Sequence, residues 1–210
     1  MQEVKNLSIY RQSLRDRILE TAISLFMKNG IRAVKMDDIA NVMSVSKRTL
    51  YEMYSDKEHL LYEGIKKDHI MRREHLKEFA SKSDSVMDVI LYAYKLNIEK
   101  FREANPLFFS DMEKYPDVIG YLNEEKIYSG TQFVDFLNRG IEEGYFRSDI
   151  NCKLIVCLFD ALGDYFKSAQ LYKQYTWEEI MMNIVFVSLR GICTSKGGKI
   201  LDGFLLTYNR

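Results

Sequence analysis

The chain has 210 residues, of which 47% are hydrophobic and 29% are charged, a composition that excludes disordered, collagen-like and disulfide-rich classes. Thirty Lys and Arg balance thirty Asp and Glu, so contact with nucleic acid would require a local patch of positive charge. The length allows one or two domains, and only two prolines are present to interrupt helices.

Helical periodicity runs through almost the whole sequence. The expected helices span residues 11–28, 36–43, 47–54, 55–79, 85–103, 117–144, 150–172, 176–192 and 199–206, with a short one between Pro106 and Pro116. Capping boxes at Ser55–Glu58 and Thr176–Glu179, and a cap at Ser148-Asp149, mark starts, whereas Gly30 and Gly197-Gly198 mark breaks. The sequence therefore predicts an all-α protein of about nine or ten helices.

No apolar run approaches the roughly 18 residues that a membrane-spanning helix needs, and the N-terminal residues do not form a signal-peptide core. Three cysteines without a CxxC pair are expected to be small buried hydrophobes. We therefore expect a cytoplasmic protein.

Two short helices joined by a tight turn within the first 54 residues suggest a helix-turn-helix. Its small core is expected from Ile39, Ala40, Val45 and Leu50. Ser46 is placed to cap the second short helix, which leaves the N-terminal amides of that helix facing outward. Lys47, Arg48 and Thr49 follow at that end, and these residue types suit phosphates and base edges.

Several motifs occur here in one register: Gly30, Asp38-Ile39-Ala40, Val45–Tyr51, Tyr54 and Asp56–Leu61. In this order the segment from Gly30 to Leu61 resembles the DNA-binding domain of TetR-family transcriptional regulators. The resemblance covers about the first 60 residues. It implies a three-helix DNA-binding domain over residues 1–60 and a larger helical domain over residues 61–210 for effector binding and dimerisation.

The segment departs from the family pattern at positions that bear on which DNA sequence is read. Met43-Ser44 stands where alanine-glycine is frequent in the turn, so the turn is expected to be altered. Lys35 replaces a common Thr or Ser, and Arg48 replaces a frequent glycine. Glu52 and Met53 stand where histidine or polar residues are common.

The resemblance implies a set of DNA-contacting residues. Those on the groove-facing side are Lys47, Arg48, Thr49, Glu52 and Met53. Those expected to bind phosphates are Lys35, Thr49, Tyr51, Tyr54 and Lys57. Arg48 suits bidentate contact with guanine and Glu52 suits cytosine N4. The alternative is that the charged residues are solvated surface and that the two tyrosines belong to the core.

The resemblance also implies a homodimer that presents two recognition helices to a near-palindromic operator. The apolar stripes expected at the dimer interface are Ile155, Leu158, Phe159, Leu162, Phe166, Ile184 and Val187. An effector pocket for an apolar or aromatic small molecule is expected from Tyr94, Phe101, Phe108, Phe109, Met112, Phe133 and Phe136. For both sets the alternative is ordinary intramolecular core.

No arrangement for catalysis or metal binding is visible. His59, His69 and His75 lack metal-ligand spacing, and neither a GxSxG elbow nor a phosphate-cradling glycine loop occurs. We therefore expect no enzyme, no metal and no cofactor. The favoured hypothesis is a DNA-binding regulator, acting as a repressor that a small-molecule effector releases from its operator. The alternative is an all-helical protein–protein adaptor that keeps the fold without reading DNA, and an enzyme that uses the aromatic residues ranks third.

Overall fold

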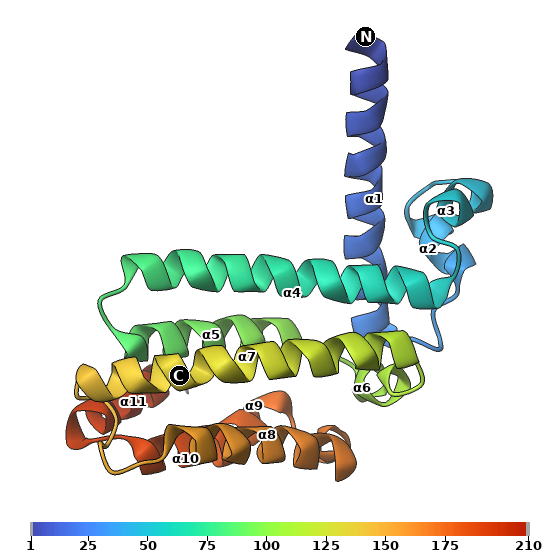
Figure 1. Cartoon of the computed structure of the whole chain (residues 1–210). Helices are drawn as coiled ribbons and strands as arrows, with labels where there is room; N and C mark the ends of the chain where they lie inside the picture. The colour runs from blue at the N-terminus through green and yellow to red at the C-terminus, as the bar shows by residue number, and fades with distance from the viewer. Residues whose placement is uncertain (1, 209–210) are drawn as a thin grey trace. The chain divides into compact units, whose positions relative to one another are not determined.

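The computed structural model describes residues 2–208, with side-chain environments for residues 9–127 and 129–206 (Figure 1). The helices are α1 (Gln2–Asn29), α2 (Met36–Val42), α3 (Lys47–Met53), α4 (Lys57–Lys82), α5 (Val86–Phe101), α6 (Pro106–Met112), α7 (Pro116–Glu142), α8 (Cys152–Ser168), α9 (Trp177–Ile180), α10 (Phe186–Ile192) and α11 (Ser195–Tyr208). A 3-10 turn, η1 (Leu171–Lys173), follows α8, and a π-helical turn, η2 (Met181–Val185), joins α9 and α10 into one continuous helix. Across residues 2–208 the all-α prediction is confirmed, with one isolated bridge between Phe146 and Cys193. None of the helices described is both long and apolar enough to cross a membrane.

The chain divides into two compact units. The first unit comprises Met1–Met71 and Glu103–Leu122, and the second comprises Arg72–Arg102 and Asn123–Arg210. Helices α4 and α7 each contribute residues to both units. The first unit therefore includes α6, which lies well beyond residue 60 in the sequence. That residues 1–60 by themselves form the DNA-binding domain stays a prediction.

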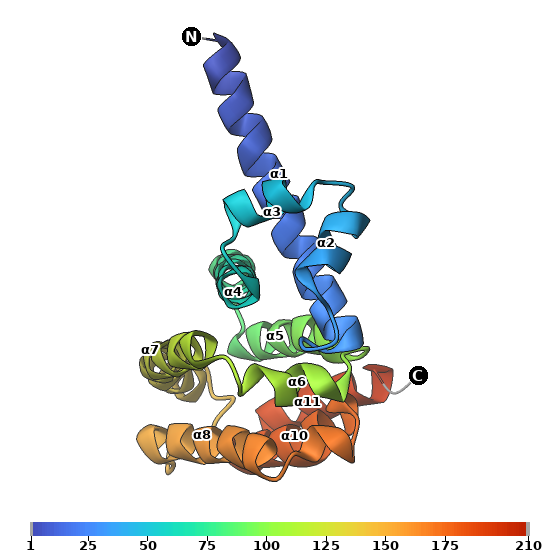
Figure 2. The same cartoon turned by 90° about the vertical axis from the view of Figure 1, so that its right-hand side faces the viewer.

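The first unit is built on α1, with α2 packed against α1 and α3 against α2 (Figure 2). The side of α1 that faces this unit's core is apolar. Ile18, Ala22 and Phe26 are fully buried on this face, at spacings of four residues that keep them on one side of the helix. Helix α1 starts at Gln2 rather than at the predicted residue 11 and ends as expected before Gly30. Gly30 has a φ of 86°, which a residue without a Cβ adopts at no steric cost.

The second unit has its own hydrophobic core. Its most deeply buried residues come from α5, α7, α11 and the turn after α7, and are Val86, Met87, Ile98, Leu137, Phe146 and Leu201. Gly140 of α7 permits this packing, because a Cβ at that position would lie 2.3 Å from the Phe146 ring. The close approach of helix and ring thus depends on a glycine.

Helix starts differ from the predicted ones where two polar residues compete for the cap. Asp56, not Ser55, caps α4, since its carboxylate accepts a hydrogen bond from the His59 amide at 2.8 Å. Asn151 rather than Ser148-Asp149 caps α8. The Thr176–Glu179 capping box is confirmed.

The predicted break at Gly197-Gly198 is wrong. Both glycines lie inside α11, and Gly197 packs so closely that a Cβ would lie 2.4 Å from the Tyr145 carbonyl oxygen. At this position the glycine serves close packing rather than chain reversal.

We expect the substitution Gly140→Ala to destabilise the protein by about 1–3 kcal/mol, the usual effect of overpacking a core. Urea unfolding followed by circular dichroism measures this change. Gly120→Ala on the same helix is the matched control, because a Cβ there would meet nothing within 4 Å. The control should be neutral or stabilising by about 0.5–1 kcal/mol, since alanine favours helix. Equal stabilities of the two variants would contradict the packing described.

Candidate nucleic-acid interface

Helices α2 and α3 form a helix-turn-helix. The two helices are in contact, and Ile39 and Ala40 of α2 and Leu50 of α3 are fully buried as predicted. Ser44 in the turn has a φ of 53°, so the serine adopts the left-handed conformation for which alanine-glycine turns use glycine. The amide of Val45 then donates to the Ala40 carbonyl at 3.0 Å. The turn is therefore altered as expected, in that Ser44 has a strained backbone conformation while the hydrogen bonding around it is ordinary.

The N-terminus of α3 faces solvent and is capped by Ser46, whose hydroxyl accepts a hydrogen bond from the Thr49 amide at 3.0 Å. Lys47 and Arg48 are exposed at this end, and 88% of the Arg48 side chain is accessible. Tyr51 is also exposed on α3. The unpaired amides and the cations at this end both favour negatively charged groups.

Each of the two cations has a carboxylate partner. The Arg48 Nε atom donates to Glu52 Oε1 at 2.8 Å, one helical turn further along α3. Lys47 is bound by Asp37 of α2. Hydrogen bonding raises the pKa of Lys47 and of Arg48 and lowers the pKa of Glu52. Because both pairs are exposed, separating them costs little, so DNA phosphates and bases can replace the carboxylates.

Lys35 precedes α2, and its side chain is exposed as a phosphate contact requires. The Lys35 amide donates to Asp38 Oδ2 at 2.8 Å, which fixes the start of α2. Thr49 is half-buried, with its hydroxyl 2.7 Å from that of Ser46. That Lys35, Thr49 and Tyr51 contact DNA stays a prediction.

Two predicted DNA contacts, Met53 and Tyr54, are instead buried. Met53 follows Leu50 by three residues and so shares its core-facing side of α3, whereas Tyr54 is the extended residue that ends the helix. The Tyr54 hydroxyl donates to the Arg15 carbonyl of α1 at 3.2 Å, and burial raises the pKa of Tyr54. The alternative interpretation of Tyr54 as a core residue is the one that the structure supports.

Lys57, predicted to bind phosphate, is half-buried and tied to the backbone. Its Nζ atom donates to the Ile31 carbonyl at 3.0 Å and lies 3.4 Å from the Arg32 carbonyl. Burial lowers the pKa of Lys57. The ammonium group thus joins the start of α4 to the loop between α1 and α2.

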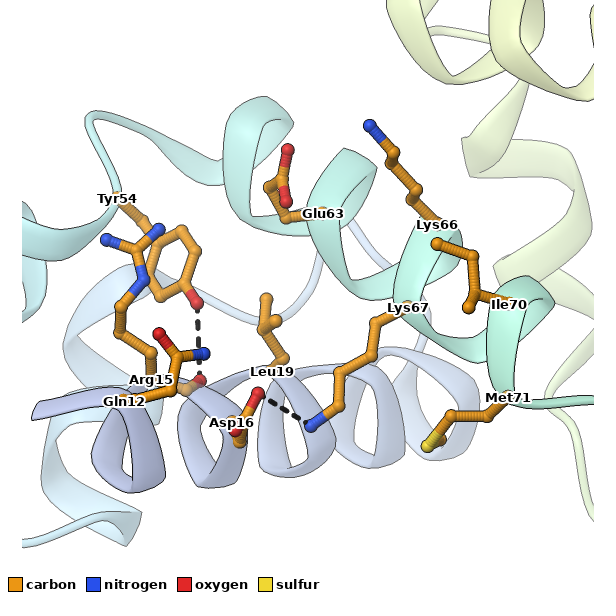
Figure 3. Close-up of a pocket in the computed structure, with 10 residues that line it drawn as sticks. All are labelled: Gln12, Arg15, Asp16, Leu19, Tyr54, Glu63, Lys66, Lys67, Ile70 and Met71. Carbon is orange, nitrogen blue, oxygen red and sulfur yellow. Dashed lines mark hydrogen bonds and ion pairs between the residues drawn. The ribbon is translucent and has the colours of Figure 1, made fainter. Parts of the chain in front are cut away.

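A groove of about 510 Å³ runs between α1 and α4 in the first unit (Figure 3). Lys67 spans it and donates to Asp16 at 2.9 Å and to Glu20 at 3.0 Å. At the end of the groove near α3, the Arg15 guanidinium lies 4.9 Å from the centre of the Tyr54 ring. Arg15, Asp16, Glu20 and Lys67 are not among the residues predicted from the sequence, although the one-turn spacing of Asp16 and Glu20 on α1 is visible there.

The residues predicted to bind an effector are divided between the two units. Phe108, Phe109 and Met112 belong to α6 and the first unit, whereas Tyr94, Phe101, Phe133 and Phe136 belong to the second. Ring centres lie 5.5 Å apart for Phe108 and Phe109 and 4.9 Å apart for Phe101 and Trp177. Tyr94 is buried, and the centre of its ring lies 4.2 Å from the centre of the Phe186 ring. That any of these rings lines an effector pocket stays a prediction.

The residues predicted at a dimer interface separate into exposed and packed ones. Leu158 of α8 and Val187 of α10 are exposed, whereas Ile155 and Phe159 pack against the core of the second unit. The Phe166 ring lies 5.2 Å from Trp177. Leu162 and Ile184 are half-buried.

The exposed apolar side of α8 combines the predicted Leu158 with two residues that were not predicted from the sequence. Leu154 and Tyr165 are exposed with Leu158, at spacings of four and seven residues that keep them on one helix face.

Cys157 is exposed rather than buried as expected. Among the described residues, no group of three His, Cys, Asp or Glu side chains can hold a metal ion.

Comparison with known proteins links the helix-turn-helix segment to a family of regulators. The sequence model for bacterial regulatory proteins of the tetR family matches residues 18–63. The HTH-type transcriptional repressor KstR2 of Mycobacterium tuberculosis is 25% identical over 149 residues, which cover 68% of this chain and 74% of that repressor. KstR2 of Mycolicibacterium smegmatis is 24% identical over 200 residues, 89% of this chain and 94% of the relative.

The fold is shared with solved structures as well. The structure of the ketosteroid transcriptional regulator KstR2 of Mycobacterium tuberculosis aligns with a TM-score of 0.58 at 21% identity. The alignment covers 86% of this chain and 95% of that structure. The likeness therefore includes helices outside the helix-turn-helix segment.

We expect Lys67→Met to reduce the free energy of unfolding at pH 7 by about 1 kcal/mol or less, as for partly exposed ion pairs. Hydrogen bonding to Lys67 lowers the pKa of Asp16 from its ordinary 3.8 in the folded state. The stabilisation is therefore present above pH 3.8 and is lost as the pH falls through the lower, folded pKa. The stability difference between wild type and variant should close over that acidic range.

Urea unfolding at a series of pH values measures this difference. Lys66→Met is the matched control, because the ammonium of Lys66 lies 5.6 Å from the Tyr62 ring rather than beside a carboxylate. If wild type and Lys67→Met still differ by the same free energy of unfolding at low pH, the ion pair between Lys67 and Asp16 does not have this role.

Proposed function

Because this chain belongs to the tetR family of bacterial regulatory proteins and is a DNA-binding transcriptional regulator, we propose that it is a repressor which a small-molecule effector releases from a near-palindromic operator. The observation that carries DNA binding is the exposed front of α3. It combines free helix amides with Lys47 and Arg48, on a helix whose opposite side is buried. The names of the relatives support repression.

In this proposal α3 enters the major groove and Arg48 contacts guanine through its two terminal nitrogens. Lys47, Lys35 and Tyr51 then contact phosphates on either side, because their exposed side chains lie on or next to the two short helices. The half-buried Thr49 supports the same surface at the start of α3. The protein–protein adaptor is not favoured, since the family match falls on the DNA-binding helices themselves.

The effector is proposed to be a small, largely apolar molecule bound within residues 61–210. The predicted pocket residues of the second unit, which are Tyr94, Phe101, Phe133 and Phe136, are aromatic and favour such a ligand. One similar regulator carries the name of ketosteroids, which are molecules of this kind. Helix α4 begins in the first unit and ends in the second, so it provides a continuous path between the two. A coupling of about 1–3 kcal/mol, as is typical of allosteric proteins, would lower operator affinity about 5–150-fold.

Dimerisation is proposed to use the exposed apolar side of α8 together with Val187 of α10. Leu154, Leu158 and Tyr165 are 65%, 42% and 58% exposed on this side of α8. Exposed apolar side chains that share one helix face favour an interaction site there. A symmetric pair would present two α3 helices about 34–36 Å apart, one turn of DNA.

We expect Arg48→Ala to reduce specific DNA affinity about 5–150-fold, the range for loss of a bidentate base contact. The loss includes the effect of leaving Glu52 without its cation near the DNA. Mobility shift with the region upstream of the gene for this chain, at several salt concentrations, measures the affinity. Lys199→Ala removes an exposed cation of α11 and should leave affinity nearly unchanged. If wild type forms no salt-dependent specific complex, the regulator proposal fails.

We expect Leu158→Asp to convert a dimer into a monomer, because a charge would be buried at the centre of the proposed interface. Gel filtration with light scattering determines the mass of each species. Leu206→Asp changes an equally apolar, exposed residue on α11 and should leave the dimer intact. A dimeric Leu158→Asp variant would place the interface elsewhere.

A further inference from the structure

Helix α6 carries a buried carboxylate that the proposed function does not use. Asp111 is 6% exposed and is the one buried charged residue among the residues whose burial is described. A buried carboxylate is unfavourable unless hydrogen bonds and nearby charge compensate it, so its partners indicate what it does.

The partner of Asp111 is the loop that connects α1 to α2. The Arg32 amide donates to Asp111 Oδ2 at 2.8 Å, across 79 positions of sequence. Helix α6 also packs directly on Gly30, where a Cβ would lie 2.8 Å from Leu107 Cβ and 3.3 Å from Asp111 Oδ2. Just before α6, the Asn105 amide donates to the Met27 carbonyl of α1 at 2.7 Å. The end of α1 and the following loop are therefore bound along α6.

Opposite charges hold the same loop. Asp111 accepts the N–H of Arg32, while the ammonium of Lys57 donates to the carbonyl of Ile31. Attraction between Asp111 and Lys57 partly offsets the lowering of the Lys57 pKa by burial. One amide of the loop backbone, that of Arg32, and the carbonyl of Ile31 are thus bound by charged side chains, which are stronger partners than neutral ones.

The position of this loop matters for recognition. It leads directly into α2, whose first residues are fixed by Lys35 and Asp38, and α2 carries α3 through a short turn. Base contacts by Arg48 require hydrogen-bond geometry within a few tenths of an ångström. A loop that is free to move would let α2 and α3 tilt together on α1.

We propose that Asp111 is a positioning residue for DNA recognition, and that α6 completes the DNA-binding unit by holding the loop from Gly30 to Lys35. This inference rests on the proposed function. Asp111 acts through the loop and α2, and it touches neither base nor phosphate. The functional DNA-binding unit is thus discontinuous in sequence.

The test compares Asp111→Ala with Glu113→Ala in the full chain. Both substitutions remove one negative charge from the same segment, but Glu113 is exposed at the end of α6. The probes are a duplex that the wild type selects from a random pool and an unrelated duplex of equal length. Asp111→Ala should lower affinity for the selected duplex about tenfold or more, as for loss of a hydrogen bond to a charged group, and should leave affinity for the unrelated duplex unchanged. Asp111→Asn, whose amide oxygen can still accept the Arg32 N–H, should recover most of the loss.

Affinities are measured below the melting temperature of each variant, so that unfolding does not enter the ratio of specific to non-specific binding. An unchanged ratio for Asp111→Ala, or an equal loss for both alanine variants, would overturn the inference. Amide hydrogen exchange of residues 31–42 without DNA gives an independent result. Exchange there should accelerate in Asp111→Ala and not in Glu113→Ala. If wild type selects no duplex, the proposed function fails, whereas equal exchange in the two variants refutes the role of Asp111 alone.

Discussion

A helix of seven residues is not stable by itself in water, so α3 depends on the surface against which it packs. Leu50, Met53 and Tyr54 bury one side of the segment, and the hydroxyl of Tyr54 is bonded to the backbone of α1. This burial determines which side remains outside. Arg48 and Glu52 are exposed because the core residues occupy the opposite side, so the DNA contacts proposed for α3 depend on this packing.

The chain carries no net charge, and its positive charge acts through local placement. Lys47 and Arg48 are held by carboxylates of α2 and α3, at exposed positions where ion pairs are weak. These carboxylates orient the cations without holding them strongly. A polyanion with many regularly spaced phosphates can displace these carboxylates. A single exposed carboxylate of another protein would bind the cations no more strongly than the carboxylates already present.

The two units are joined by more than one connection. The chain passes between them within α4 after Met71, between Arg102 and Glu103, and within α7 after Leu122. The segment that contains α6 is thus connected to the second unit at both of its ends, while its side chains bind the loop before α2. The chain therefore joins the second unit both to the start of α4 and to the segment that contains α6.

Local signals in the sequence determined the helices and the recognition motif. The caps at Ser46 and Thr176, the glycine at position 30 and the apolar spacing of α1 depend on neighbours within a few residues, so they could be recognised without a structure. The prediction that Met53 and Tyr54 contact DNA followed the family motif. The spacing of Met53 from Leu50 within α3 already indicates a buried side chain for Met53, whereas the burial of Tyr54, at the end of the helix, depends on its contact with α1.

Tertiary structure alone decided which partners Lys57 and Asp111 have. Lys57 is bound to the loop backbone, and Asp111 is buried against Arg32, a residue 79 positions away in the sequence. Likewise, which apolar residues of α8 remain exposed is decided by the packing of Ile155 and Phe159 against the core. Helices form from interactions over three or four residues, whereas burial and ion pairing depend on contacts that the chain makes only when distant segments meet.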